Sequence, residues 1–394
     1  MGDLFLTGIG QLTTNLGAPV RDAVVAVESG VITYAGPSAD APTQTGERYE
    51  CGGRAVIPGF VDAHTHLVFA GDRSDEFVRR LAGESYQDIA ASGGGILATV
   101  AATRDASNDE LFQIASERVW RMIRTGTTTV EIKSGYGLDQ ATELRQLAVA
   151  RRIAEELPVT VRTTFLGAHS VPPEYVGDRT GYIDLVVEEM LPAVAPLADF
   201  CDVFVEEGVF DVDEAHRILT KAAEHGLKAR VHAEQLGHSG GALLAADLGA
   251  LSADHLDHAD EEDARALAAA GVTAVLVPGA SYTLRSRQAP GPMLARAGCT
   301  IAVATDCNPG TSYFESMAPI LSLAVVQMGL TVDQAIAAAT LGGALSLGYD
   351  DRGFVAAGGV GDLLVLDAPS TSHLVYRPGA NLIHRTFKGG VSVG

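Results

Sequence analysis

The chain has 394 residues, 47% of them hydrophobic and 20% charged, so it can bury a large core and is neither disordered nor fibrous. Its formal net charge of −21 disfavours nucleic acid and anionic membrane surfaces as partners, because phosphate binding needs clustered Lys and Arg. An anionic small molecule remains compatible with this charge where a local cation receives it.

The first residues, MGDLFLTGIGQLTT, lack the basic and apolar regions of a targeting signal. No stretch reaches the roughly 18 apolar residues that a bilayer span needs. The cytoplasm is therefore the expected location. The four cysteines lie far apart without a Cys-x-x-Cys pair, which predicts reduced thiols, no disulfides and no thiolate zinc site.

Both ends of the chain have the pattern of antiparallel β structure. From Asp3 to about Tyr49, short alternating runs are punctuated by Gly and Pro. The last stretch repeats this style in DLLVLDA, HLVYRP, LIHRTFKGG and VSVG. Two β-rich ends around a different middle predict one small β-sandwich domain, assembled from residues 1–55 and 348–394.

The middle, residues 56–347, alternates apolar strands with amphipathic helices, which predicts parallel βα units. The strand candidates are VIPGFVDAHTH, TTTVEIKSG, VTVRTTFLGAH, CDVFVEE, LKARVHAE, LSADHLDH, TAVLVPG and TIAVATD. Eight strands are the number that closes a (β/α)8 TIM barrel.

Helix boundaries between these strands carry recognisable signals. Helices are expected to start where a capping residue precedes Glu or Gln by three positions, as at Ser107, Asp211 and Thr331. Helices are expected to end at glycines, which accept the left-handed backbone of a helix end. These glycines are Gly126, Gly226 and Gly271.

Polar residues at strand ends are the candidates for chemistry, because a barrel gathers its catalytic groups there. His64 and His66 end the first strand candidate and share one face of it. The other strand ends carry His169, His232, His255 and Asp306. Taken by themselves, His64 and His66 could be two ordinary histidines at a strand end with their hydrogen bonds satisfied. Five of eleven histidines at strand ends instead predict a site for a divalent metal.

The expected metal ligands are three histidines and one carboxylate: His64, His66, His232 and Asp306. Such a set leaves one position open for water, which is typical of a catalytic site. The bound water would lose a proton near neutral pH and give a hydroxide nucleophile. Zn²⁺ and iron both suit histidine and carboxylate ligands, and one ion per chain is expected.

The sequence also resembles a known family. The run VIPGFVDAHTHLVFAGDR is similar to the opening strand of the amidohydrolase superfamily. In this order, KSGYGL, FLGAH, HAEQ, SADH and ATDCNPGT resemble the imidazolonepropionase family, from about Val56 to Leu347. The resemblance implies hydrolytic opening of the cyclic amide of 4-imidazolone-5-propanoate to N-formimidoyl-L-glutamate, a step of histidine degradation. It also implies a homodimer.

Carried over residue by residue, the resemblance implies the same four metal ligands and makes His255 a catalytic residue. The implied substrate contacts are Arg73, Tyr136, His169, Asn308, Gly310 and Thr311. His169 could also polarise the ring carbonyl or carry a proton, and Asp306 could shuttle the proton of the water. Which of these three groups is the general base stays open.

The residue types fit these roles, but each also has a structural alternative. Arg73 offers a planar cation for the propionate carboxylate, or it is a solvated arginine at a helix start. Tyr136 lies between two glycines that allow close approach to a ligand, or it is an ordinary loop aromatic. Asn308 is an amide partner for the ring, or a turn residue before Pro309.

Three polar positions refine the expectation. Some relatives carry Glu where this chain has Gln235, and an amide cannot act as a base, so Gln235 is expected to contact the substrate. The fourth strand candidate has no Lys to bridge two metals. Lys133 is expected to be a structural or substrate-orienting charge, while Glu206 or Glu207 is expected to orient a ligating histidine.

Two other functions compete with this hypothesis. A nucleobase-type deaminase would also use one metal and a histidine on the sixth strand, but Arg73 and the NPGT loop suit an acidic substrate better. A metal-binding barrel without catalysis predicts that a ligand would be missing, and none is missing from the sequence.

Overall fold

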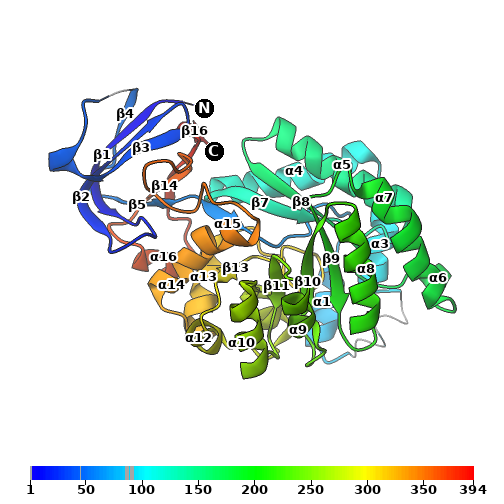
Figure 1. The fold of residues 1–394 in the computed structure, drawn as a ribbon. Helices are drawn as coiled ribbons and strands as arrows, with labels where there is room; N and C mark the ends of the chain where they lie inside the picture. The colour runs from blue at the N-terminus through cyan, green and yellow to red at the C-terminus, as the bar shows by residue number, and fades with distance from the viewer. Residues whose placement is uncertain (1, 45, 85–87, 89–92) are drawn as a thin grey trace.

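Two eight-stranded sheets organise the computed structural model, which describes residues 2–44, 46–84, 88 and 93–394 (Figure 1). One sheet is parallel, and its strands follow one another in chain order. They are β6 (Phe60–Asp62), β7 (Thr127–Lys133), β8 (Thr160–Ala168), β9 (Phe200–Val205), β10 (Lys228–Ala233), β11 (Ser252–His255), β12 (Thr273–Leu276) and β13 (Ile301–Val303).

The first and last parallel strands meet just beyond their ends. Thr65 and Cys307 form a parallel bridge, and the N–H of Asp306 donates to the carbonyl oxygen of His64 at 2.9 Å. The N–H of His66 donates in turn to the carbonyl of Cys307 at 3.0 Å. These bonds close the sheet on itself, and the predicted (β/α)8 barrel is confirmed.

Helices surround the parallel strands in Figure 1. The helices between β6 and β10 are α1 (Ser74–Leu81), α3 (Ile96–Asp105), α4 (Asn108–Arg124), α5 (Gln140–Glu156), α6 (Arg179–Asp184), α7 (Leu191–Val194) and α8 (Val212–Glu224). Those after β10 are α9 (Gly241–Asp247), α10 (Glu261–Ala270), α11 (Pro278–Leu284), α12 (Gly291–Ala297), α13 (Met317–Val326), α14 (Val332–Ala337) and α15 (Gly343–Ser346). None of the described helices is long and apolar enough to cross a membrane.

The predicted helix boundaries are confirmed. Capping boxes are present at Ser107, Asp211 and Thr331, so side chains satisfy the first free N–H groups of α4, α8 and α14. The three glycines predicted to end helices all have positive φ, which the absence of a Cβ permits. They are Gly126 (φ 99°), Gly226 (φ 81°) and Gly271 (φ 71°).

The second sheet combines both ends of the chain, as predicted. Its path is β16-β15-β14-β5-β1-β2-β3, with β4 paired to β1. The strands are β1 (Leu4–Leu12), β2 (Val20–Glu28), β3 (Val31–Pro37), β4 (Glu47–Glu50), β5 (Ala55–Pro58), β14 (Leu363–Leu366), β15 (Ile383–Lys388) and β16 (Val391–Val393), with helix α16 (Ser372–Tyr376) between β14 and β15. The exact limits of the two domains stay a prediction.

The expected first barrel strand, VIPGFVDAHTH, is divided between the two sheets. Its first part is β5, which pairs with β1 and β14, and only β6 joins the barrel. The change occurs at Gly59, where a Cβ would overlap the side chain of Thr128 on the neighbouring strand. A single apolar run therefore links the terminal sheet directly to the barrel and to His64.

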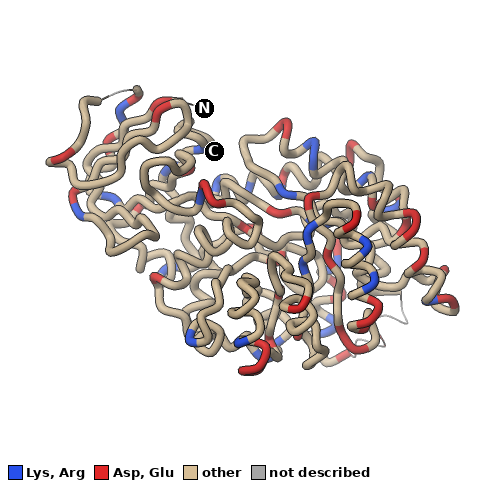
Figure 2. The backbone as a smooth tube through the Cα atoms, viewed as in Figure 1, with Lys and Arg blue, Asp and Glu red and all other residues tan. Residues whose placement is uncertain are grey.

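Charge is spread over the outer helices. In the view of Figure 2, Lys and Arg lie among Asp and Glu rather than in one basic stripe. In that view the basic residues form no large group of their own along the backbone, in agreement with the net charge of −21. The cysteines are all free thiols, and Cys51, Cys201 and Cys307 are buried.

Candidate metal centre and active site

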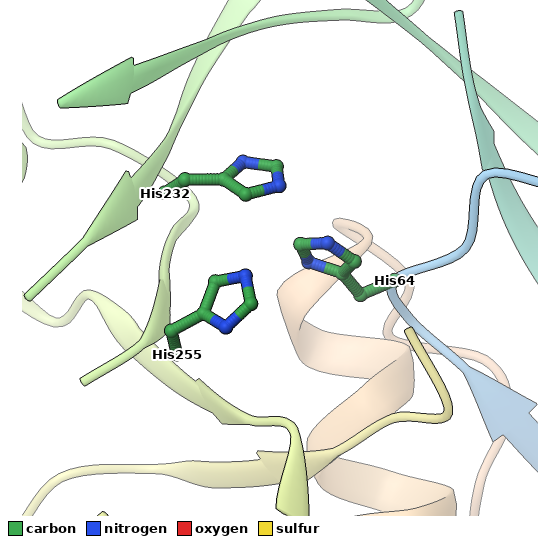
Figure 3. Close-up of side chains that lie close together, drawn as sticks. All are labelled: His64, His232 and His255. Atoms are coloured by element: carbon green, nitrogen blue, oxygen red, sulfur yellow. The ribbon is translucent and has the colours of Figure 1, made fainter. Parts of the chain in front are cut away.

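Five histidine rings converge at the carboxyl ends of the barrel strands. His64 and His66 follow β6, His169 follows β8, His232 lies in β10 and His255 ends β11. The ring centroids of His64 and His232 are 4.5 Å apart, those of His232 and His255 are 5.1 Å apart, and those of His66 and His169 are 5.2 Å apart. Figure 3 shows the rings of His64, His232 and His255 pointing toward one another. The histidines that were predicted to lie at strand ends are therefore brought together by the fold.

These rings and Asp306 form two overlapping groups that could hold a metal ion. One group is His64, His66 and Asp306, and the other is His64, His232 and His255. Within each group, one potential ligand atom per residue lies within 4.8 Å of the others. The predicted ligands His66, His232 and Asp306 are therefore divided between two groups that share His64. The assignment of four of these residues as ligands stays a prediction.

The donor atoms fit a divalent metal. Nε2 of His64, Nδ1 of His66 and Nδ1 of His255 are buried and have no hydrogen-bond partner among the described residues. Burial lowers the pKa of all three imidazoles well below the usual value, which favours the neutral form that binds metals. Burial likewise raises the pKa of Asp306, so its ionised form needs a cation nearby.

Two buried aspartates orient the histidines from behind. Oδ2 of Asp254 lies 2.6 Å from Nδ1 of His64, and Oδ2 of Asp202 lies 2.9 Å from Nδ1 of His232. The contact with Asp254 occupies Nδ1 of His64, and the carboxylate of Asp202 lies beside Nδ1 of His232, so Nε2 of each ring is left for the centre of the barrel. The expectation that Glu206 or Glu207 has this role is wrong: Glu206 accepts from the backbone N–H of Leu236 at 2.8 Å, and Glu207 is exposed.

The two aspartates could have been found from the sequence. Asp202 is a charged residue inside an otherwise apolar strand, and Asp254 lies in a short strand directly before His255. The two residues are completely buried. A carboxylate rarely lies inside such a strand without a partner, so this position is itself a signal.

A buried cation joins the two aspartates. Nζ of Lys133 lies 2.7 Å from Asp202, 2.9 Å from Glu131 and 3.6 Å from Asp254. Although burial opposes the charged amine, Asp202 and Glu131 raise the pKa of Lys133. Arg230, also completely buried, donates to Asp254 at 3.0 Å. Lys133 is thus a structural charge, which was one of its two expected roles.

Three residues around the centre have left-handed backbone. The φ angles are 79° at His255, 50° at Asp306 and 55° at Glu234. Positive φ in residues with a side chain costs about 1–3 kcal/mol each, and the surrounding structure has to enforce it. The backbone therefore turns sharply after β11 at His255 and after β13 at Asp306, the two residues that face the site.

His169 presents a defined ring nitrogen. Its Nδ1 lies 3.0 Å from the carbonyl oxygen of Gly135, so Nδ1 carries the proton and Nε2 is free to accept a hydrogen bond. Burial, together with the charge of His232, lowers the pKa of His169 to about 3. The ring also stacks on His66 with an interplanar angle of 17°. His169 is therefore neutral and held in place.

The KSGYGL segment forms a tight loop around Tyr136. The carboxylate of Glu143 accepts three backbone N–H groups, from Gly135, Gly137 and Leu138, at 2.8–3.0 Å. Gly135 has φ 100°, and a Cβ there would lie 3.0 Å from Nδ1 of His169. Tyr136 is buried, and its ring centroid is 5.4 Å from that of His169 and 5.7 Å from that of His66. Tyr136 therefore packs on the histidine cluster.

Arg73 lies beside the loop that follows β13. It donates to Glu76 at 2.9 Å and 2.5 Å, and its guanidinium packs against Gly310 so closely that a Cβ there would overlap it. The alternative of a solvated arginine is contradicted, since its side chain is only 10% exposed. Nη1 has no hydrogen-bond partner among the residues the structure describes and remains free for a ligand.

Asn308 holds the loop after β13 together. Its Nδ2 donates to the carbonyl of Asp306 at 2.7 Å, and its Oδ1 accepts from the N–H groups of Gly310 and Thr311 at 2.8 Å. These are the contacts of a turn residue, the structural alternative. Gln235, in contrast, makes no side-chain hydrogen bond within the described part of the chain. Substrate contacts by Asn308, Gly310, Thr311 and Gln235 stay predictions.

Comparison with known proteins agrees with this geometry. Residues 55–393 match the amidohydrolase family. The imidazolonepropionase of Sphingopyxis alaskensis is 48% identical over 94% of this chain and 93% of its own length. The imidazolonepropionase of Symbiobacterium thermophilum is 46% identical over 98% of this chain and 96% of its own length.

Solved structures with lower sequence identity share the fold. A 5-methylcytosine deaminase from Klebsiella pneumoniae, liganded with 5-fluorocytosine, superposes with a TM-score of 0.77 at 18% identity, covering 99% of this chain and 97% of that one. A zinc-bound adenosine deaminase from Xanthomonas campestris gives a TM-score of 0.73 at 20% identity, covering 99% of this chain and 92% of that one. At these identities the likeness concerns the fold alone.

Proposed function

Because the chain belongs to the amidohydrolase family, and within it to the imidazolonepropionases, we propose that it hydrolyses the cyclic amide of 4-imidazolone-5-propanoate to N-formimidoyl-L-glutamate. In this reaction water adds to the ring carbonyl carbon and the adjacent C–N bond breaks. The carbonyl becomes a carboxylate, and the released nitrogen takes up a proton. The observation that carries the proposal is the convergence of buried imidazoles on one centre, where Nε2 of His64 and Nε2 of His66 lie 3.4 Å and 3.5 Å from Oδ1 of Asp306.

The proposed holders of a divalent metal are His64, His66, His232 and Asp306. A metal bound by them supplies Lewis acidity, which lowers the pKa of water and polarises a carbonyl group. Asp254 and Asp202 keep Nε2 of His64 and of His232 directed at the centre. Either Zn²⁺ or iron suits this donor set, and we propose one ion per chain because no lysine lies on β9.

His169 is proposed to bind the substrate ring. Since Nδ1 donates to Gly135, the free Nε2 accepts a hydrogen bond from a ring N–H. Its low pKa prevents it from acting as a cationic acid at neutral pH. Proton transfer is proposed for His255 or Asp306, which are both buried and each lie close to His64.

An absorbance assay with freshly prepared imidazolone propionate tests the function. Metal-loaded protein should remove the imidazolone absorbance, and Asp306→Ala should lose the activity while retaining the fold. Cytosine, guanine and hydantoin serve as alternative substrates in the same assay. Release of ammonia from cytosine or guanine, with imidazolone propionate left intact, would overturn the proposed substrate and favour a deaminase.

Assembly and location remain part of the proposal. We propose a homodimer in the cytoplasm by analogy with the relatives. The net charge of −21 argues against nucleic acid as a partner. Sedimentation of the metal-loaded protein at micromolar concentration checks the dimer, and a monomer would contradict it.

A further inference from the structure

A second arginine lies beside the loop that contacts Arg73. Arg80 is in the last turn of α1, and its Nη1 donates to the carbonyl oxygen of Gly310 at 3.2 Å. Arg73 packs against the same glycine. Asn308 ties this loop to the backbone of Asp306, so both guanidinium groups contact a loop that begins at a candidate metal ligand.

The charges in this cluster do not balance. Glu76 makes two hydrogen bonds with Arg73 and accepts a third from the N–H of Gly95 at 2.8 Å. Arg80 forms no ion pair with any carboxylate that the structure describes. Two guanidinium cations against one carboxylate leave one net positive charge beside Gly310. In a chain with a net charge of −21, a local excess of positive charge of this kind is needed to bind an anion.

Arg80 also has unused hydrogen-bond donors. Its Nε and Nη2 are buried, and neither has a partner among the described residues. An unsatisfied buried donor is unfavourable, and a charged donor more so, unless a ligand satisfies it. Nε and Nη2 form one edge of a guanidinium group, and this edge matches the two oxygens of a carboxylate.

We propose that Nε and Nη2 of Arg80 bind the propionate carboxylate of the substrate, and that Arg80, rather than Arg73 alone, supplies the uncompensated charge. This inference rests on the proposed function, since it assigns the carboxylate of that substrate to a second residue. Arg73, held by Glu76, then contributes its free Nη1, which also lies against Gly310.

Steady-state kinetics of Arg80→Gln test the proposal with two substrates: imidazolone propionate and an imidazolone that carries an ethyl group in place of the propionate. With the propionate substrate, KM should rise about tenfold or more, because a charge-assisted contact is lost. With the uncharged analogue, KM should change little. Arg80→Lys should restore part of the preference for the charged substrate, since it keeps the charge without the planar edge.

Arg79→Gln is the matched control, because Arg79 is the adjacent residue and pairs with Glu84 at the surface. It should leave both KM values unchanged. The melting temperature of Arg80→Gln should stay close to that of the wild type, because two of the removed donors are unsatisfied in the folded protein. An unchanged KM for the propionate substrate, or an equal loss with both substrates, would overturn the role of Arg80.

Failure of the proposed function is a separate result. If wild-type protein leaves imidazolone propionate intact, the substrate assignment fails, and the kinetics of the Arg80 variants no longer test the carboxylate site. Calorimetric titration with glutarate then still tests the carboxylate site. Weaker glutarate binding by Arg80→Gln than by Arg79→Gln would support it, and equal binding would contradict it.

Discussion

Asp254 and His64 are 190 positions apart in the sequence, yet Oδ2 of Asp254 lies 2.6 Å from Nδ1 of His64. The contact fixes the proton on Nδ1 and turns Nε2 toward Asp306, whose Oδ1 is 3.4 Å away. Asp254 is itself held by Arg230 at 3.0 Å and faces Lys133 at 3.6 Å. The position of a candidate metal ligand therefore depends on a charge network below it.

Replacing Asp254 by Asn should weaken metal binding. The amide lacks the charge that holds the Nδ1 proton of His64, and removal of such a partner typically lowers metal affinity about 10–100-fold. Competition between the protein and a chelator for Zn²⁺ measures the change. Asp367→Asn, which alters a surface pair with Arg54, is the control. Equal affinities in the two variants would show that Asp254 does not position His64.

Lys133 should be needed for stability. Lys133→Met removes the cation that separates Glu131 from Asp202 and leaves both carboxylates buried. Breaking a buried ion pair in this way costs about 3–5 kcal/mol of unfolding free energy. Urea unfolding of the metal-free protein measures the loss without the contribution of the ion.

Lys221→Met is the control for Lys133, since Lys221 pairs with Glu224 at the surface. A solvent-exposed pair contributes little to stability, so this variant should unfold close to the wild type. A similarly small effect of Lys133→Met would mean that the buried carboxylates of Glu131 and Asp202 do not need the cation for stability.

Much of the barrel could be predicted from the sequence because its signals are local. A capping residue such as Ser107 and a helix-ending glycine such as Gly126 act within one turn of backbone. Strand ends could be located from apolar runs, so the convergence of His64, His232 and His255 followed from the closure of the barrel.

The partners of those histidines could not be assigned because they depend on register between strands. His232 and Asp254 are neighbours in the pairing of β10 with β11, and Asp202 approaches from β9. Glu206 directly follows β9 in the sequence, as a partner of a histidine would. The chain turns at this point, however, and the carboxylate of Glu206 accepts from the N–H of Leu236 instead. The division of VIPGFVDAHTH at Gly59 likewise depends on the contact with Thr128.

Gly135→Ala should lower catalytic efficiency by displacing His169. The residue has φ 100°, and its Cβ would lie 3.0 Å from Nδ1 of His169 and 3.0 Å from the carbonyl of Leu166. A small displacement of a substrate-binding group can lower kcat/KM by roughly tenfold to a hundredfold. Gly298→Ala, with φ 93° and no atom within 4 Å of the added Cβ, carries similar backbone strain without the clash. If both variants lose the same activity, strain rather than the position of His169 explains the loss.

Asp257 should make stability depend on pH. Its Oδ2 accepts from Ser281 at 2.7 Å, but its Oδ1 is buried and has no partner in the described part of the chain. Burial raises the pKa of Asp257 from 3.8 to about 7. Between these two pH values the folded protein holds a proton that the unfolded chain has lost. The unfolding free energy should therefore fall as pH rises from about 4 to about 7, by at most roughly 1.4 kcal/mol per pH unit from this group.

Asp257→Asn removes this dependence, because the amide stays neutral at every pH and still accepts the hydrogen bond from Ser281. Urea unfolding at pH 5 and at pH 8 measures the effect. Relative to the wild type, the variant should gain unfolding free energy between these two pH values, since only the wild type has to ionise Asp257. Asp333→Asn, an exposed residue in the first turn of α14, should leave the wild-type slope unchanged. Identical slopes for Asp257→Asn and the wild type would mean that the buried carboxyl ionises freely, and that its unpartnered Oδ1 is solvated in the folded protein.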